Sequence, residues 1–384
     1  MANTRRSRNL TRLLILLLLL LLAGLVLRRL ADTHLRAYSA LLQASGSKET
    51  GFATSFARHP VREELGSAQT PQGTLAFRMY VPQDVKHPPA MLLLHGVHHL
   101  GFNEPRLVGF SRALAGAGVT VMTPQLDLLA DYRITPETIA AIGNSAVVLS
   151  TRMGQPVGVL GLSFAGGLAL LAASKPEYAP KIGFVVAVGA HDDMARVARF
   201  FAANLIEQPD GSSAPLAAHE YGALVLAYSH IDHFFSAPDV PVAQSALRLW
   251  LWEQPREAMT AAQGLSPAGK AELDELLHHR ERLRVQLAQE IERHQEEMEA
   301  VSPHGHLSQL KTPVYLLHGA GDTVIPASET EWLARDIPRQ DLKIALISPA
   351  LVHVNVDGTL TFAQKWDLVD FLAKVLDAAD GLGR

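Results

Sequence analysis

The sequence contains no cysteine, and this absence removes several functions at once. Without thiols the chain can form no disulfide, carry no cysteine nucleophile and build no thiolate metal site, although the compartment stays open. An excess of positive charge is also lacking: the formal net charge is -4, and we expect no nucleic-acid partner. No phosphate-binding glycine loop, dinucleotide fingerprint or internal repeat occurs, so we expect no bound cofactor.

A basic segment and a nearly pure leucine run begin the chain. Several arginines precede the apolar run from Leu13 to Leu27, and Arg28 and Arg29 follow it. The run is shorter than the roughly 20 residues that comfortably span a bilayer, but no small-residue cleavage site directly follows it. We expect residues 1–30 to be a transmembrane signal anchor in the lipid bilayer, with a cleaved signal peptide as the alternative. The arginines favour a cytoplasmic N-terminus and an extracytoplasmic, periplasmic location for the rest.

Short apolar segments alternate with helical patterns along much of the chain. The predicted strands of the first half are residues 75–81, 90–94, 119–122, 157–160 and 182–188. Such alternation is typical of an α/β fold in which a mostly parallel sheet carries helices on both faces. The rhythm stops near residue 191 and returns at residue 314.

The interruption divides the chain into segments. We expect a stalk or linker with a first edge element at 31–69, a first core part at 70–193, a helical cap at 194–310 and a second core part at 311–384. Residues 271–300 carry one apolar stripe at helical spacing, so we expect a single amphipathic cap helix there. A coiled-coil partner helix is the alternative.

A serine stands between a predicted strand and a predicted helix. Ser163 has Gly161 two positions before it and Ala165 two positions after it, which fits a nucleophile elbow. Only small residues fit beside so sharp a turn, and the turn holds the hydroxyl at a helix N-terminus, where N–H groups favour an oxyanion. Ala165 stands where glycine is usual. The alternative is a serine that caps a buried helix.

Two further loops supply the partners that a serine nucleophile needs. Asp322 follows the strand at 314–317, and His353 follows the strand at 343–347, so the chain order is Ser, Asp, His. The imidazole removes the serine proton, and the carboxylate orients the imidazole. Asp192 and Asp193, just past the strand at 182–188, are the alternative acid. A structural interpretation instead makes Asp322 an ordinary turn residue and His353 a core histidine.

These motifs resemble the α/β-hydrolase family, and specifically its bacterial, membrane-anchored, cap-bearing serine hydrolases. The resemblance rests on the serine turn, on the Leu-Leu-Leu-His-Gly run at 92–96 and on the Gly-Asp-Thr-Val-Ile-Pro run at 321–326. It covers roughly residues 73–191 and 311–376. The cap and the N-terminal segment have no such support.

The resemblance implies a serine hydrolase that cleaves a carboxylic ester or a related acyl substrate through an acyl-enzyme. Ser163, His353 and Asp322 would form the triad, and the N–H groups of Val97 and Phe164 the oxyanion hole. A non-catalytic, membrane-tethered binding protein and an acyltransferase remain alternatives. The sequence identifies no particular protein partner.

Histidines are frequent, and one group invites a metal interpretation. His230, Asp232 and His233 have a plausible ligand set for zinc. Histidines at this spacing with one carboxylate are common on cap helices, so we expect no metal.

Overall fold

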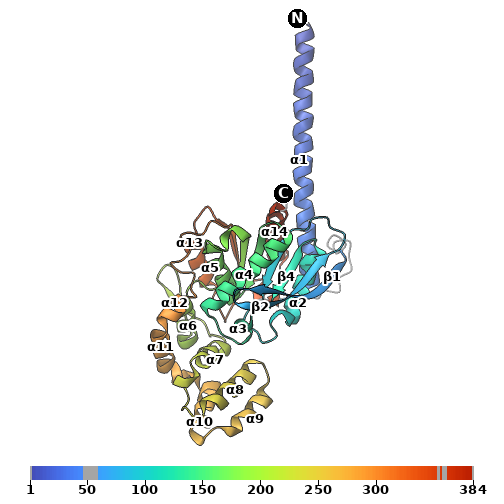
Figure 1. Ribbon diagram of the computed structural model, residues 1–384. Coiled ribbons are helices and arrows are strands. Elements are labelled where there is room, and N and C mark those ends of the chain that lie inside the picture. The colour runs from blue at the N-terminus through green and yellow to red at the C-terminus, as the bar shows by residue number, and fades with distance from the viewer. Residues whose placement is uncertain (1, 46–58, 353–354, 357–360, 383–384) are drawn as a thin grey trace.

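A long helix, an α/β core and a group of cap helices make up the molecule (Figure 1). The computed structural model describes residues 2–45, 59–352, 355–356 and 361–382. Helix α1 (Ala2–Ala44) projects from the core on the side away from the cap helices α8, α9 and α10.

An eight-stranded sheet forms the centre of the core, in the order β1-β2-β4-β3-β5-β6-β9-β10. The strands are β1 (Val61–Thr70), β2 (Gly73–Pro82), β3 (Ala90–Leu94), β4 (Thr120–Pro124), β5 (Val157–Leu162), β6 (Ile182–Val188), β9 (Val314–Gly319) and β10 (Leu342–Ser348). β2 runs antiparallel to both β1 and β4, and the remaining pairs are parallel. The predicted α/β class with a mostly parallel sheet is confirmed.

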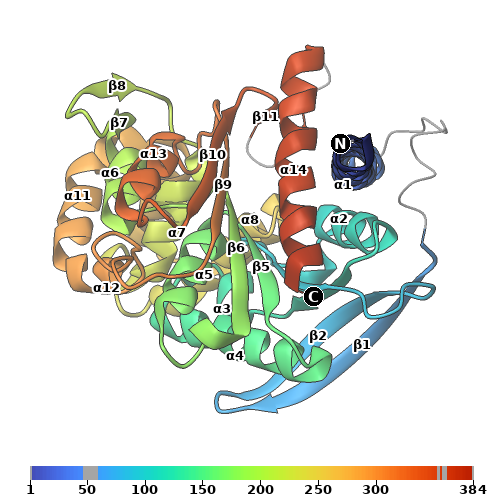
Figure 2. The same cartoon turned by 90° about the horizontal axis from the view of Figure 1, so that it is seen from above.

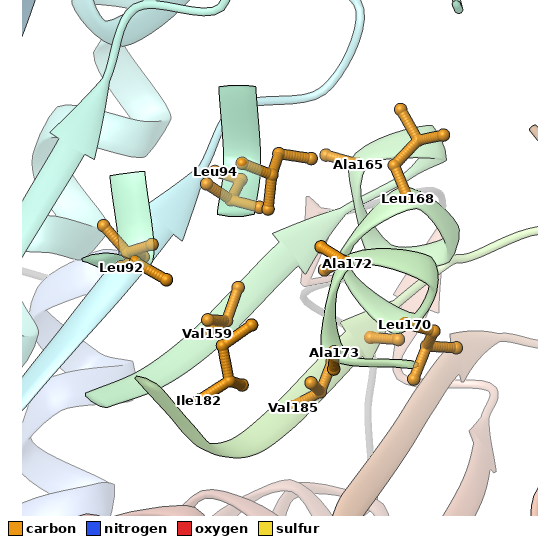
Figure 3. Close-up of a cluster of buried hydrophobic side chains, with 14 of the residues drawn as sticks. Leu92, Leu94, Val159, Ala165, Leu168, Leu170, Ala172, Ala173, Ile182 and Val185 are labelled. Atoms are coloured by element: carbon orange, nitrogen blue, oxygen red, sulfur yellow. The ribbon is translucent and has the colours of Figure 1, made fainter. Parts of the chain in front are cut away.

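Helices cover both faces of this sheet. They are α2 (Pro105–Gly116), α3 (Asp127–Ala130), α4 (Pro136–Met153), α5 (Phe164–Ser174), α13 (Ser328–Asp336) and α14 (Phe362–Leu382), with short 3-10 turns η2 (Gly101–Asn103) and η3 (Ala179–Lys181). One face packs on α4, α5 and α13, and the other on α2, α14 and the end of α1. The small side chains of α5 let it lie close to β5 and β6, as Ala172, Val159 and Val185 show in Figure 3.

Between β6 and β9 the chain is mostly helical and has its own apolar core. Its elements are α6 (Met194–Ala203), β7 (Leu205–Glu207), β8 (Ser213–Pro215), α7 (Glu220–Ser229), η4 (Ile231–His233), α8 (Val240–Leu251), α9 (Pro255–Ala261), η5 (Ala262–Gly264), α10 (Pro267–His278), η6 (Arg280–Leu283), α11 (Arg284–Arg293) and α12 (Gln295–Glu299). We call this segment the cap. It includes the small β7–β8 hairpin, for which the sequence had no signal.

The prediction of one continuous helix over 271–300 is wrong. The helical path is interrupted at His279 and again at His294, where the backbone leaves the helical region. A straight helix of this length would extend about 45 Å. Folding back instead lets Leu276, Leu287 and Ile291 pack into one cap core.

The C-terminal part of α1 packs on the core, whereas the sequence indicated a stalk from residue 31. Figure 2 shows α14 between the sheet and α1. Arg36 donates to the Ala117 carbonyl at 2.8 Å and pairs with Asp380 at 2.7 Å. Ala37 and Ala40 are buried in the same cluster as α14. Residues 31–44 therefore belong to the packed core.

The N-terminal part of α1 carries exposed apolar side chains. They are Ile15, Leu16, Leu17, Leu18, Leu19, Leu21, Leu22, Leu25 and Leu27. Among the described residues, no helix has both the length and the apolar character required to cross a membrane.

Candidate active site

The chain turns sharply between β5 and α5, and Ser163 occupies the turn. Its φ of 55° and ψ of -134° lie outside the regions that a non-glycine residue ordinarily adopts. Such strain persists only where the surroundings enforce it, and it gathers at functional sites. Among the described residues the Ser163 side chain makes no capping hydrogen bond to α5. The hydroxyl is therefore not used as a helix cap, which was the alternative interpretation.

Steric crowding explains the small residues around this turn. A methyl group on Gly161 would lie 2.5 Å from the Ala165 carbonyl oxygen and 2.7 Å from Gly166 Cα. Ala165 itself is fully buried and packs in the core cluster of the sheet. The turn thus accepts alanine at the second position and requires glycine at the first.

The loop after β3 passes directly beside the serine. A methyl group built on Gly96 would lie 3.3 Å from Ser163 Cβ. His95 holds this loop, because its Nδ1–H donates to the Gly96 carbonyl at 2.7 Å while Nε2 accepts the Leu126 N–H at 3.1 Å. Burial lowers the pKa of His95 to about 4, so the ring is neutral near pH 7 and keeps these two roles.

The two predicted oxyanion donors belong to the two segments next to Ser163, which are the start of α5 and the loop after β3. Phe164 is the first residue of α5, and the first N–H groups of a helix have no acceptor within the helix. Val97 follows Gly96 on the β3 loop, and its carbonyl accepts a hydrogen bond from the Tyr221 hydroxyl at 3.3 Å. The cap helix α7 is therefore fixed to this loop. Burial raises the pKa of Tyr221, so the phenol keeps its proton and acts as donor.

Asp322 lies just past β9 and is buried, with 1% of its surface exposed. Its Oδ1 accepts the N–H groups of Val324 at 2.8 Å and Ile325 at 3.1 Å, which is the local turn bonding considered as an alternative. Oδ2 is directed elsewhere: it lies 3.5 Å from the position of a methyl group built on Gly189. One oxygen holds the turn, and the other points toward the end of β6.

The end of β6 brings the serine and the aspartate to the same edge of the sheet. The Ser163 N–H donates to the Val188 carbonyl at 2.8 Å, and Asp322 Oδ2 faces Gly189, the next residue. Both side chains therefore lie at the carboxyl ends of parallel strands, on either side of β6, where open α/β sheets place their sites.

The predicted histidine, His353, lies outside the described residues. It falls in the sequence between two short strands, β11 (Leu351–Val352) and β12 (Asn355–Val356). The chain just before it does reach the site edge, since the Leu351 carbonyl oxygen lies 2.5 Å from a methyl position on Gly319. The role of His353 stays a prediction.

Another histidine, His318, lies near Asp322, and both of its ring nitrogens have hydrogen-bond partners. His318 is fully buried, with Nδ1 2.7 Å from Thr330 Oγ1 and Nε2 2.8 Å from the Ile325 carbonyl. Its Nε2 lies farther from Asp322 Oδ2, at 3.6 Å. His318 therefore stabilises the loop after β9 that carries Asp322, through its contact with the Ile325 carbonyl.

The alternative acids belong to a separate ion cluster. Arg196 Nη2 pairs with Asp192 at 2.8 Å, and Arg196 Nε contacts the buried Glu329 at 2.5 Å. Glu329 also accepts the backbone N–H groups of Asp192 and Asp193. This cluster joins the start of the cap to α13, so the contacts favour Asp322 as the acid beside Ser163.

A cavity of about 370 Å³ lies between the core and the cap. Phe164 and Ile134 line it from the core, and Tyr221, Val225 and Met298 line it from the cap. Ser163 is not among the described residues that line it, but its neighbour Phe164 is. The cavity is large enough for a small acyl or alcohol group.

Sequence reasoning missed Tyr221 and the cavity. Tyr221 lies on a cap helix with no recognisable motif, and it meets Val97 across more than a hundred residues of chain. Its single local signal was a tyrosine in an otherwise apolar run, which is equally typical of a core position.

No family model matches the sequence, and a search of curated proteins gave no match. Solved structures with a similar path include 2,6-dihydroxy-pseudo-oxynicotine hydrolase, at 16% identity, TM-score 0.44, and coverage of 84% of this chain and 70% of that chain. An esterase of Pyrobaculum calidifontis has 14% identity, TM-score 0.43, and coverage of 90% and 91%. Brefeldin A esterase, described as a bacterial homologue of human hormone-sensitive lipase, has 15% identity, TM-score 0.46, and coverage of 92% and 84%.

Because these TM-scores are below 0.5, we assign the fold from the molecule itself. A mostly parallel eight-stranded sheet, a strained serine between β5 and α5, and an aspartate after β9 together define an α/β-hydrolase fold. These features support the resemblance to the α/β-hydrolase family as far as the fold is concerned.

Proposed function

We propose that this protein is a serine hydrolase that cleaves a carboxylic ester or a related acyl substrate. The observation that carries the proposal is the turn at Ser163. The Ser163 backbone is strained and its hydroxyl does not cap α5. Gly96 lies against it, in the loop after β3 that carries the predicted oxyanion donor Val97 and that we call the oxyanion loop. A strained serine that stands at a helix N-terminus without capping the helix is suited to attack on a carbonyl carbon.

The proposed reaction has two halves. Ser163 Oγ attacks the carbonyl carbon while the imidazole of His353 accepts its proton, and the N–H groups of Val97 and Phe164 stabilise the oxyanion. The imidazole then protonates the leaving alcohol, which departs and leaves an acyl-enzyme. The same imidazole then takes a proton from water, which attacks the acyl carbon, and returns that proton to Ser163 Oγ as the bond to the serine breaks and the acid departs. Asp322 orients the imidazole throughout. Each oxyanion donor typically contributes about 2.7–4 kcal/mol to transition-state binding.

We also propose that α1 anchors the chain in a lipid bilayer through the run from Leu13 to Leu27, with the hydrolase domain extracytoplasmic. Exposed leucines on the projecting part of α1 support this, because a long exposed apolar helix surface has no favourable partner in water. The basic residues on both sides of the run suit the lipid headgroups.

An alkyl fluorophosphonate probe tests the proposal. We expect covalent labelling of the wild type, loss of labelling in Ser163→Ala, and full labelling in the matched control Ser174→Ala, at the other end of α5. Asp322→Asn is expected to label far more slowly, because loss of the triad carboxylate lowers kcat about 10⁴-fold in such enzymes.

Further outcomes of the same experiment are decisive. An unlabelled wild type, or labelling that survives in Ser163→Ala, would refute the hydrolase and favour a binding protein. The labelled chain is expected in the membrane fraction and to be released by detergent but not by high salt. Release by salt alone would contradict the anchor.

A further inference from the structure

Two segments of the cap, distant in sequence, bring imidazoles and carboxylates together. His233 ends η4, while Glu290 lies on α11 and His294 separates α11 from α12. The ligand atoms of these three residues all lie within 4.8 Å of one another. His233 Nδ1 is 2.5 Å from Glu290 Oε2, and His294 Nε2 is 3.5 Å from the same oxygen. The three residues thus bring their possible metal-ligand atoms close enough together to surround one ion.

The ring of His294 is oriented as in many metal sites. Its Nδ1 lies 3.1 Å from Glu297 Oε1, and a neutral ring that donates Nδ1–H to this carboxylate has its lone pair on Nε2. That Nε2 is buried and has no hydrogen-bond partner among the described residues. A metal-binding histidine typically donates its other N–H to a carboxylate in this way. The ring of His230 stacks on His294 at 3.6 Å between centroids and holds it in place.

Glu290 is a buried carboxylate whose cationic partner is mostly in solvent. It is 3% exposed, and its Oε1 lies 2.7 Å from Arg293 Nη1. The Arg293 side chain is 54% exposed, and its Nη1 also lies 3.0 Å from His233 Nδ1, so the guanidinium contacts two of the three residues and competes with an ion for them. Burying a carboxylate is costly unless a strong positive partner compensates. A divalent cation between Glu290 and the two imidazoles would compensate it better.

We propose that His233 Nδ1, Glu290 and His294 Nε2 bind one Zn²⁺ ion. Two imidazoles and one carboxylate are a donor set that zinc accepts, with the fourth position left to water or a ligand. Arg293 moves into solvent when the ion binds. Because His230 and His294 also line the cavity, the ion fixes one cavity wall by joining η4 to α11. The sequence pointed to His230 and His233 as possible ligands, but it gave no signal that Glu290 and His294 lie beside His233.

Zinc titration of the full chain tests the site independently of any hydrolase activity. After dialysis against a chelator, calorimetry with ZnCl₂ is expected to give one ion per chain, and zinc is expected to raise the Tm. His294→Ala and Glu290→Gln are expected to lose this binding. Glu297→Gln should keep the stoichiometry but weaken the affinity about 10- to 100-fold, as loss of such an orienting carboxylate does.

Two more variants keep the test decisive if a ligand variant misfolds. His278→Ala removes an exposed cap histidine, 53% exposed on its side chain, and should bind zinc like the wild type. Arg293→Ala should bind zinc more tightly, because the competing cation is gone. The proposal is overturned if the wild type binds no zinc, if folded Glu290→Gln binds as well as the wild type, or if Arg293→Ala binds more weakly.

Discussion

The substitution Gly161→Ala probes the turn on which the proposed nucleophile depends. The new methyl group would lie 2.5 Å from the Ala165 carbonyl oxygen, whereas a comfortable C···O contact is about 3.3–3.6 Å. Because the obstacle is backbone, no side chain can rotate away. The start of α5 must separate from β5 by roughly 1 Å. Overpacking of this kind costs about 1–3 kcal/mol of stability.

The same shift acts on the site. Displacing a reacting group by about 1 Å can cost about 10²-fold in rate, so we expect the labelling of Ser163 to slow by roughly that factor. Thermal unfolding and the rate of fluorophosphonate labelling measure the two effects. Gly109→Ala is the matched control, since a methyl group on this glycine of α2 meets no atom within 4 Å. It should stabilise the protein by about 0.5–1 kcal/mol.

The two glycines should therefore respond with opposite sign. If Gly161→Ala unfolds at the wild-type temperature and labels at the wild-type rate, the crowding at this turn is not what positions Ser163. Equal destabilisation by both variants would point to a general intolerance of alanine and would equally refute the reasoning.

Two more predictions concern the cap. Tyr221→Phe removes the hydrogen bond to the Val97 carbonyl. Such a bond contributes about 0.5–1.5 kcal/mol, so we expect kcat for ester hydrolysis to fall roughly 2- to 10-fold with KM little changed. The control Tyr132→Phe loses a hydrogen bond to the Leu251 carbonyl instead and should keep the wild-type kcat. An equal loss in both variants would contradict a specific role of the cap in the oxyanion loop. Burial raises the pKa of Asp192 to about 7, so the folded state binds this proton more tightly than the unfolded state. Stability from this group is present at low pH and lost as pH rises through about 7, so Asp192→Asn should show a smaller fall in Tm than the wild type between about pH 5 and about pH 8. Parallel curves for the two proteins would refute this.

Local patterns determined the core of the molecule. The alternation of apolar runs with helical segments predicted the sheet, because buried parallel strands and their covering helices leave a local imprint on the sequence. The turn at Ser163 was equally readable, since the crowding that requires Gly161 arises between residues only four apart. Asp322 was placed by its position after β9. The role of His353 as the base that removes the Ser163 proton stays a prediction.

Long-range contacts decided the rest. The stripe at 271–300 was correctly predicted to be buried, but its two breaks depend on the cap core into which it folds. Residue 31 onward joined the core because Arg36 finds partners on α14 and after α2. Likewise, Tyr221 meets Val97, and Glu290 meets His233, across segments whose separate sequences carry no sign of the pairing. A local pattern specifies which side of an element is buried, whereas the partner it is buried against is fixed only when the whole chain competes for the same space.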